Sequence, residues 1–307
     1  MSLFPSSIYL NWNSKNNWNV SFRVNCSNSS SKYITSVNLR DAKKTIKVYA
    51  SVKNKYCKVV KDDKIQKRFS NSPLLKSNLQ KCVRLGKTEE ALVTALNLIQ
   101  IDLFNFVRRL IIISIEDVGV VLDNIELLVF LLMSYQNIEI TNEIIQELLL
   151  TVYSLCVYPT KHIPSSDNTE LDYLEYDYND TKLVSLIIAS EYGGFHGDIL
   201  LYKKMINSFD RKILSVKKGN LILTRGINRN DILISSVDHH CNPLIIDYIT
   251  ENTHLKGDII KSLIWNNSSK INYRESHEII DNEVWKNVTK FQRKYALQII
   301  SKMYYKN

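Results

Sequence analysis

The stretch that decides the fold reads NSPLLKSNLQKCVRLGKTEEALVTALNLI and covers residues 71–99. Upstream of it, β-branched and aromatic residues form short runs in which apolar and polar side chains partly alternate. Within it, apolar residues recur every three to four positions, which is typical of an amphipathic helix. The period changes at Asn71-Ser72-Pro73, so the sequence predicts a β-rich start followed by a helical remainder.

The residues before this break predict strands separated by turns. Clusters of Asn and Ser lie between the β-branched runs, as is typical of turns. In the last run, alternation places Ile46, Val48 and Ala50 on one face. Lys47 and Tyr49 fall on the other face. The expected strands are 7–12, 18–25, 31–39 and 45–60.

The residues after the break predict helices joined by short links. Leu75, Leu79 and Cys82 belong to one apolar stripe. Gly86 is expected to end that helix and Thr88 to cap the next one. Further helices are expected over 103–115, 123–134, 141–157, 182–192, 198–207, 242–252, 256–265 and 282–304.

These patterns predict an α+β protein. We expect a small N-terminal β-rich basic domain over 1–70, followed by a larger α-helical bundle or array over 74–307. The helical part is interrupted by an acidic loop near 159–180. That loop has three interpretations: a solvated loop, an electrostatic partner for the basic segment, or a strip that binds another protein.

The positive charge is concentrated in one segment. The chain has a formal net charge of +9, and residues 40–68 alone hold eleven Lys or Arg against three Asp. Clustered cations neutralise nucleic-acid phosphates, although lysines on one face of a strand also protect a sheet edge from aggregation. Residues 265–274 mix aromatic, amide and basic side chains in a pattern that also suits nucleic acid. The candidate nucleic-acid-binding residues are Lys43, Lys44, Lys47, Tyr49, Lys53, Lys55, Tyr56, Lys58 and Arg274.

Gly86-Lys87-Thr88 resembles the end of a phosphate-binding loop but lacks its context. The full motif requires an earlier Gly where this chain has Lys81, and no strand precedes it. The chain has only eight Gly, which also argues against phosphate-binding loops rich in Gly. We therefore expect no nucleotide hydrolysis, no cofactor and no catalytic residue here.

Two clusters leave an alternative open. Residues 192–198 are either a link between helices, with Asp198 as the cap of the second, or a site where backbone approaches a phosphate or base. Residues 238–241 are either a packed polar cluster or part of a hydrolase or nucleic-acid-modifying pocket. Their spacing does not predict a metal site. The candidate pocket residues are Gly194, His196, Asp198, Asp238, His239 and His240.

Targeting signals are not expected. Residues 1–10 have no basic region followed by an apolar one, which argues against a signal peptide. The longest apolar run, 110–133, contains four carboxylates, each costing about 2.5–3.5 kcal/mol at a bilayer centre. The five Cys show no pairing pattern, as expected in a reducing compartment. The sequence therefore predicts an intracellular protein, cytoplasmic or nuclear, without a membrane span.

Part of the helical region resembles a known family. The matching pieces are LQKCVRLG (79–86), EAL (90–92), RRL (108–110) and ISIEDVG (113–119). They resemble, with similar spacing, the C-terminal helical region of the replication-associated recombination protein A family, clamp-loader-like ATPases related to Werner-helicase-interacting protein. The segments 192–198 and 237–241 look like stretches in uncharacterised proteins of phages and large DNA viruses.

The resemblance implies a role in a DNA transaction but no catalytic activity. It covers residues 75–121, and the ATPase motifs of the family are missing from this chain. In that family the region supports assembly into oligomers. The resemblance therefore implies a helical fold, a role in a DNA transaction, and either a homo-oligomer or a protein partner. A structural ion-pair network or interface is expected among four residues: Arg108, Arg109, Glu116 and Asp117.

Together these observations predict a non-enzymatic, DNA-associated accessory protein in replication, repair or genome handling. A viral origin is one expectation for it. Nucleic acid, with DNA favoured over RNA, is the expected partner of the basic segment. The alternative is a structural adaptor that joins protein partners. A third and weaker hypothesis is the hydrolase or modifying enzyme whose pocket is named above.

Overall fold

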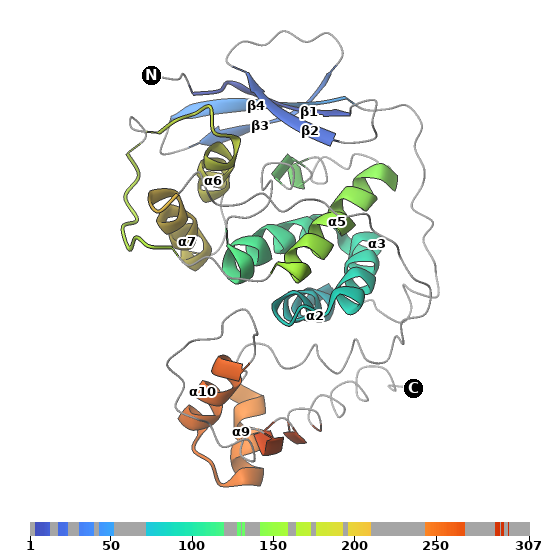
Figure 1. The fold of residues 1–307 in the computed structure, drawn as a ribbon, viewed down its shortest axis with the longest axis vertical. Helices are drawn as coiled ribbons and strands as arrows, with labels where there is room; N and C mark the ends of the chain where they lie inside the picture. Colours follow the sequence, from blue (N-terminus) through green and yellow to red (C-terminus); the bar gives the residue numbers. More distant parts are fainter. Residues whose placement is uncertain are drawn as a thin grey trace. The chain divides into compact units, whose positions relative to one another are not determined.

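The structure is a computed structural model and combines one sheet with helices (Figure 1). Four strands at the N-terminus precede the helical segments, which confirms the α+β class predicted from the sequence. The structure describes residues 4–12, 18–23, 31–39, 43–51, 72–119, 128–129, 131–132, 142–158, 164–172, 176–192, 196–209, 243–267, 286–288, 290–291 and 294.

The sheet consists of β1 (Ser7–Trp12), β2 (Trp18–Arg23), β3 (Lys32–Leu39) and β4 (Lys44–Ala50). Its strand order is β2-β1-β4-β3, with the two central strands parallel and both outer pairs antiparallel. Within the described residues the predicted strands are confirmed with small differences at their ends, except that the strand expected over 45–60 ends at Ala50, because Ser51 is not in a strand. The second half of the expected 45–60 strand lies outside the described residues from position 52 onward.

One face of the sheet carries the apolar side chains. Ile8, Leu10, Ile46, Val48 and Ala50 are fully buried, which confirms the predicted alternation along β4. Burying a branched aliphatic side chain stabilises a fold by about 1.5–3 kcal/mol, so this apolar row contributes strongly to the stability of the sheet. The helix α6 (Thr181–Tyr192) contacts β3 and is itself buried along most of its length.

The helices α2 (Ser72–Arg84) and α3 (Thr88–Ile113) are joined by a tight turn at Gly86. The Gly86 N–H donates to the carbonyl of Val83 at 3.1 Å, and the Lys87 N–H donates to that of Cys82 at 2.8 Å. These two bonds, with Gly86 at a φ of +64°, are the Schellman arrangement that closes a helix. The expected role of Gly86 as a helix terminator is confirmed.

The helix α3 is interrupted at Asp102, whose backbone is not helical (φ −157°, ψ 77°). The sequence placed the same break between the helix that begins at Thr88 and the one expected over 103–115. The second part ends in a π-helical turn, η1 (Ser114–Val118), closed by a 2.7 Å bond from the Gly119 N–H to the Ser114 carbonyl. The turn carries Glu116 and Asp117 of the family-like segment.

The remaining helices lie close to their predicted positions. They are α5 (Asn142–Val157), α7 (His196–Asn207), α9 (Pro243–Thr253) and α10 (Gly257–Asn267). The helix α7 begins two residues before Asp198, so this residue lies in its first turn instead of capping it. None of the described helices is long and apolar enough to cross a membrane.

The chain forms two compact units. The first consists of residues 1–60, 103–151 and 162–219, and the second of 61–102, 152–161 and 220–307. The first contains the sheet, α6, α7 and η1, while α9 and α10 belong to the second, where they share a core that includes Ile249, Ile260 and Val288. The division of the chain into a domain over 1–70 and a domain over 74–307 stays a prediction.

Candidate nucleic-acid interface

The outer face of the sheet, opposite the apolar row, is polar, aromatic and basic. Cross-strand partners share a face, so the strand register defines its members. The residues on this outer face are Ser7, Tyr9, Asn11, Asn19, Ser21, Arg23, Tyr33, Ser36, Asn38, Thr45, Lys47 and Tyr49. None of these described strand residues is acidic, so the face attracts anions.

Tyrosine rings from three strands contact one another across this face. The rings of Tyr9 and Tyr49 lie parallel, with centroids 4.8 Å apart and planes 11° apart. The Tyr33 ring meets Tyr49 edge-on at 5.8 Å and 72°. On the other side, the Arg23 guanidinium lies 5.1 Å from the centre of the Tyr9 ring. Each such pair is worth about 0.5–1.5 kcal/mol beyond simple burial, so the rings hold one another in place.

Exposure increases along this row of rings. Tyr9 is only 1% exposed, Tyr49 is half-buried, and Tyr33 is 51% exposed. The outer ring therefore has an accessible surface, and its neighbour fixes its position. An exposed ring held in this way is the arrangement on which nucleic-acid bases stack.

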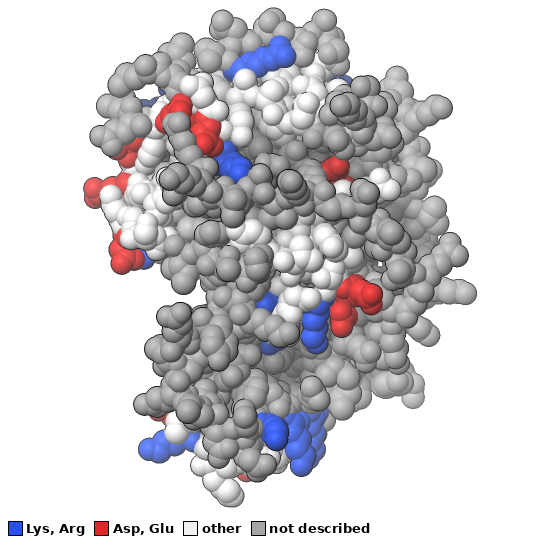
Figure 2. All heavy atoms as spheres, in the orientation of Figure 1, with Lys and Arg blue, Asp and Glu red and all other residues white. Residues whose placement is uncertain are grey.

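Exposed lysines lie beside the rings. Lys47 is on the outer face, two residues before Tyr49 and opposite Ser36 of β3. Lys43 and Lys44 lie at the start of β4, where Lys43 adopts a left-handed backbone (φ +49°). Lys44 is the partner of the buried Leu39, so it belongs to the opposite, apolar face. Figure 2 shows Lys and Arg at the top, over the sheet, and Asp and Glu on the left, over the loop beside α7.

The remaining candidates for nucleic-acid contact lie outside the described residues. They are Lys53, Lys55, Tyr56, Lys58 and Arg274. Tyr33 was not among the candidates named from the sequence, and the strand register explains why. Val37 and Leu39 are buried, so strict alternation would place Tyr33 on the buried face as well. A register shift between Tyr33 and Thr35 moves this ring to the outer face, opposite Tyr49.

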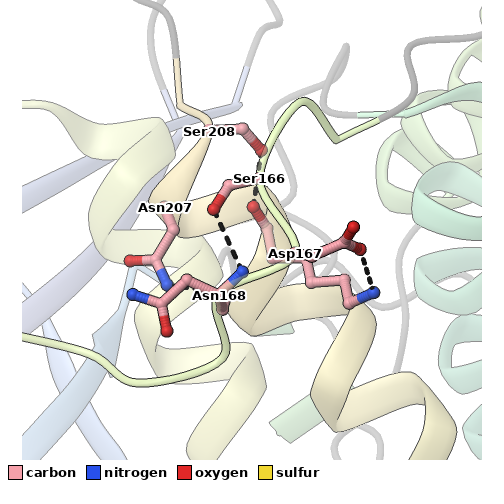
Figure 3. Close-up of polar contacts among 6 residues, drawn as sticks. Ser166, Asp167, Asn168, Asn207 and Ser208 are labelled. Carbon is pink, nitrogen blue, oxygen red and sulfur yellow. Dashed lines mark hydrogen bonds and ion pairs between the residues drawn. The ribbon is translucent and has the colours of Figure 1, made fainter.

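The described part of the acidic loop is bound to α7 (Figure 3). The Asn207 amide donates to the carbonyls of Asn168 and Glu170, both at 2.9 Å. The Asp167 carboxylate forms a 2.6 Å ion pair with Lys204. A hydrogen bond from this ammonium, together with its charge, lowers the pKa of the exposed Asp167 carboxyl. These contacts give the loop a defined conformation, with the carboxylates of Asp167, Glu170 and Asp172 at the surface.

The four residues of the expected ion-pair network lie in the second part of α3 and in η1. Asp117 is only 2% exposed, while Arg108, Arg109 and Glu116 are partly buried. Each of them takes part in a polar or electrostatic interaction. Direct pairing among the four, and an oligomer interface built on them, stay predictions.

The alternative pocket is described only at two positions. His196 is exposed and Asp198 is partly buried, both in the first turn of α7. Burial, and then the charge of Asp198, raises the pKa of the Tyr202 hydroxyl one turn further on. Gly194, Asp238, His239 and His240 lie outside the described residues, so their convergence with α7 stays untested. The described part of the chain holds no group of three His, Cys, Asp or Glu side chains suited to a metal ion.

The described cysteines are buried thiols. The Cys82 thiol lies in α2 and donates to the Asn78 side-chain carbonyl at 3.7 Å. Burial, with smaller contributions from Cys82 and Glu90, raises the pKa of the Cys156 thiol. A buried thiol of raised pKa is a poor nucleophile, so Cys156 contributes packing rather than chemistry.

No known protein family, no curated protein and no solved structure matches this chain.

Proposed function

We propose that this protein is a non-enzymatic accessory protein that binds nucleic acid through its basic, β-rich segment. The observation that carries the proposal is the outer sheet face, where Lys47 lies beside the rings of Tyr49 and Tyr33, which meet edge-on. Cations supply affinity for phosphates, and exposed rings supply contacts to bases. The surrounding segment 40–68 carries a large local excess of positive charge, which strengthens the attraction.

DNA is the favoured partner, and replication, repair or genome handling the favoured setting. This part of the proposal rests on the resemblance of residues 75–121 to the replication-associated family described above. That resemblance also supports assembly of the helical region into oligomers. No catalytic step is proposed.

A filter-binding assay tests the proposal with the full chain and labelled single- and double-stranded DNA and RNA. At about 50 mM salt, a protein that neutralises several phosphates retains nucleic acid on the filter. Retention that falls steeply with added salt supports the proposal. An absence of retention for all four ligands at this salt concentration contradicts it.

A further inference from the structure

The outer sheet face combines a positioned aromatic surface with a neighbouring cation. The Tyr33 ring is half exposed and forms a T-shaped pair with Tyr49, which in turn stacks on the buried Tyr9. The ring is therefore ordered before any ligand arrives, so binding costs little side-chain entropy. Its exposed surface is available to a flat, apolar group.

The spacing of the cation suits a nucleotide. Lys47 and Tyr49 are two residues apart on one face of β4, which corresponds to about 6.8 Å along the strand. Tyr33 lies directly opposite Tyr49 on β3. In a nucleotide, the base and the phosphate are attached to opposite sides of the sugar. Tyr33 can therefore contact the base while Lys47 contacts the phosphate of the same nucleotide.

Base faces are accessible only in an unpaired strand. In a duplex each base is covered above and below by its neighbours, whereas a single strand can turn bases out onto aromatic rings. The exposed hydroxyl of Ser36 and amide of Asn38 lie beside Lys47 on the same face and add hydrogen-bonding groups for sugar and phosphate. The outer-face residues carry no carboxylate that would repel the backbone.

We infer that the outer face of β3 and β4 is a binding site for single-stranded nucleic acid, in which a base stacks on Tyr33 and Lys47 contacts the backbone phosphate. This inference rests on the proposed function and specifies its ligand. Lys43 extends the path of the backbone toward the start of β4. Stacking accepts any base, so the site discriminates by strandedness rather than by sequence.

Fluorescence anisotropy with the full chain tests the inference, using labelled oligo(dT) and a blunt duplex as probes. Tyr33→Ala is expected to weaken oligo(dT) binding by about 5- to 150-fold, the range of one lost base stack. Tyr33→Phe keeps the ring and is expected to bind within about twofold of the original protein. Tyr33→Leu removes the flat ring but keeps apolar bulk against Tyr49, and is expected to resemble Tyr33→Ala.

Lys47→Gln is expected to weaken binding of oligo(dT) and to reduce its salt dependence, because one phosphate contact is lost. Lys256→Gln removes an equally exposed charge before α10 and serves as the matched control. Far-ultraviolet circular dichroism verifies that each variant is folded. Tyr33 is half exposed, and Tyr33→Leu keeps apolar bulk against Tyr49, so this variant is expected to fold. It therefore replaces Tyr33→Ala in the test if that variant does not fold.

The outcomes separate this inference from the proposed function. Unchanged oligo(dT) affinity in folded Tyr33→Leu, or binding of the duplex alone, overturns the single-strand site while the nucleic-acid proposal stands. Equal losses for oligo(dT) and duplex in the Tyr33 variants also overturn it, because stacking would not be the cause. Binding of neither probe by the original protein overturns both proposals.

Discussion

At the scale of single residues, Asp180 fixes the start of the helix that contacts the sheet. Its carboxylate accepts hydrogen bonds from the N–H groups of Lys182 and Leu183 at 3.0 and 3.2 Å. These are two of the backbone donors that the first turn of α6 leaves without a partner inside the helix. The core residues of α6, such as Val184 and Ile187, follow directly.

Replacing Asp180 with Ala is expected to lower the free energy of unfolding by about 1 kcal/mol, because the two N–H groups lose their acceptor. Asp180→Asn keeps an oxygen acceptor and is the matched control, with an expected loss well below that of Ala. Urea denaturation followed by circular dichroism measures both. Equal stability of Asp180→Ala and the original protein would contradict this account of the cap.

The Asp167–Lys204 pair predicts a pH effect of known sign. The ammonium lowers the carboxyl pKa below its ordinary value of 3.8 in the folded protein. Because folding lowers the pKa of this carboxyl, the ion pair contributes its full stabilisation at pH values above the unfolded pKa. That stabilisation is lost as the pH falls through the lower pKa of the folded protein. Nuclear magnetic resonance titration of the Asp167 carboxyl should give a pKa that rises toward 3.8 in Lys204→Met. An unchanged pKa in that variant would show that the ion pair does not form.

At the scale of elements, the sequence predicted the helices and strands well because their signals are local. Period, capping residues and Gly86 all act within one or two turns, so the α2–α3 hairpin and the break at Asp102 follow from neighbouring residues. The sheet order does not, because the parallel pairing of β1 with β4 joins segments about 40 positions apart. The register shift beside Tyr33 is equally non-local, and it decides which ring reaches the outer face.

The turn at Gly86 carries a prediction at this scale. Its φ of +64° is left-handed, and a Cβ there would lie 3.3 Å from the Cys156 carbonyl oxygen. Gly86→Ala should therefore destabilise the protein by about 1–2 kcal/mol. Gly197→Ala is the matched control, since a Cβ at this helical position would meet nothing within 4 Å. Thermal unfolding compares the two, and a Gly86→Ala variant as stable as Gly197→Ala would contradict the turn geometry.

At the scale of the whole molecule, charge is distributed unevenly along the chain. The formal charge of the protein is +9, and the basic segment 40–68 accounts for most of it. The described part of this segment is β4 with its preceding turn, which also carries the ring that contacts Tyr33. Composition alone predicted the charge, whereas the combination with Tyr33 and Arg23 depends on pairing among strands that the sequence does not reveal.

The central claim is that this basic, aromatic face binds nucleic acid, and the salt dependence of binding tests it most directly. The dissociation constant for labelled oligo(dT) is measured between low and physiological salt for the original protein and for a variant with Lys43 and Lys47 replaced by Gln. Binding that weakens steeply with salt is expected, with a logarithmic slope shallower by about 1.4 in the variant, because two phosphate contacts are lost. Identical slopes for the two proteins, or no binding by either at low salt, would contradict the account.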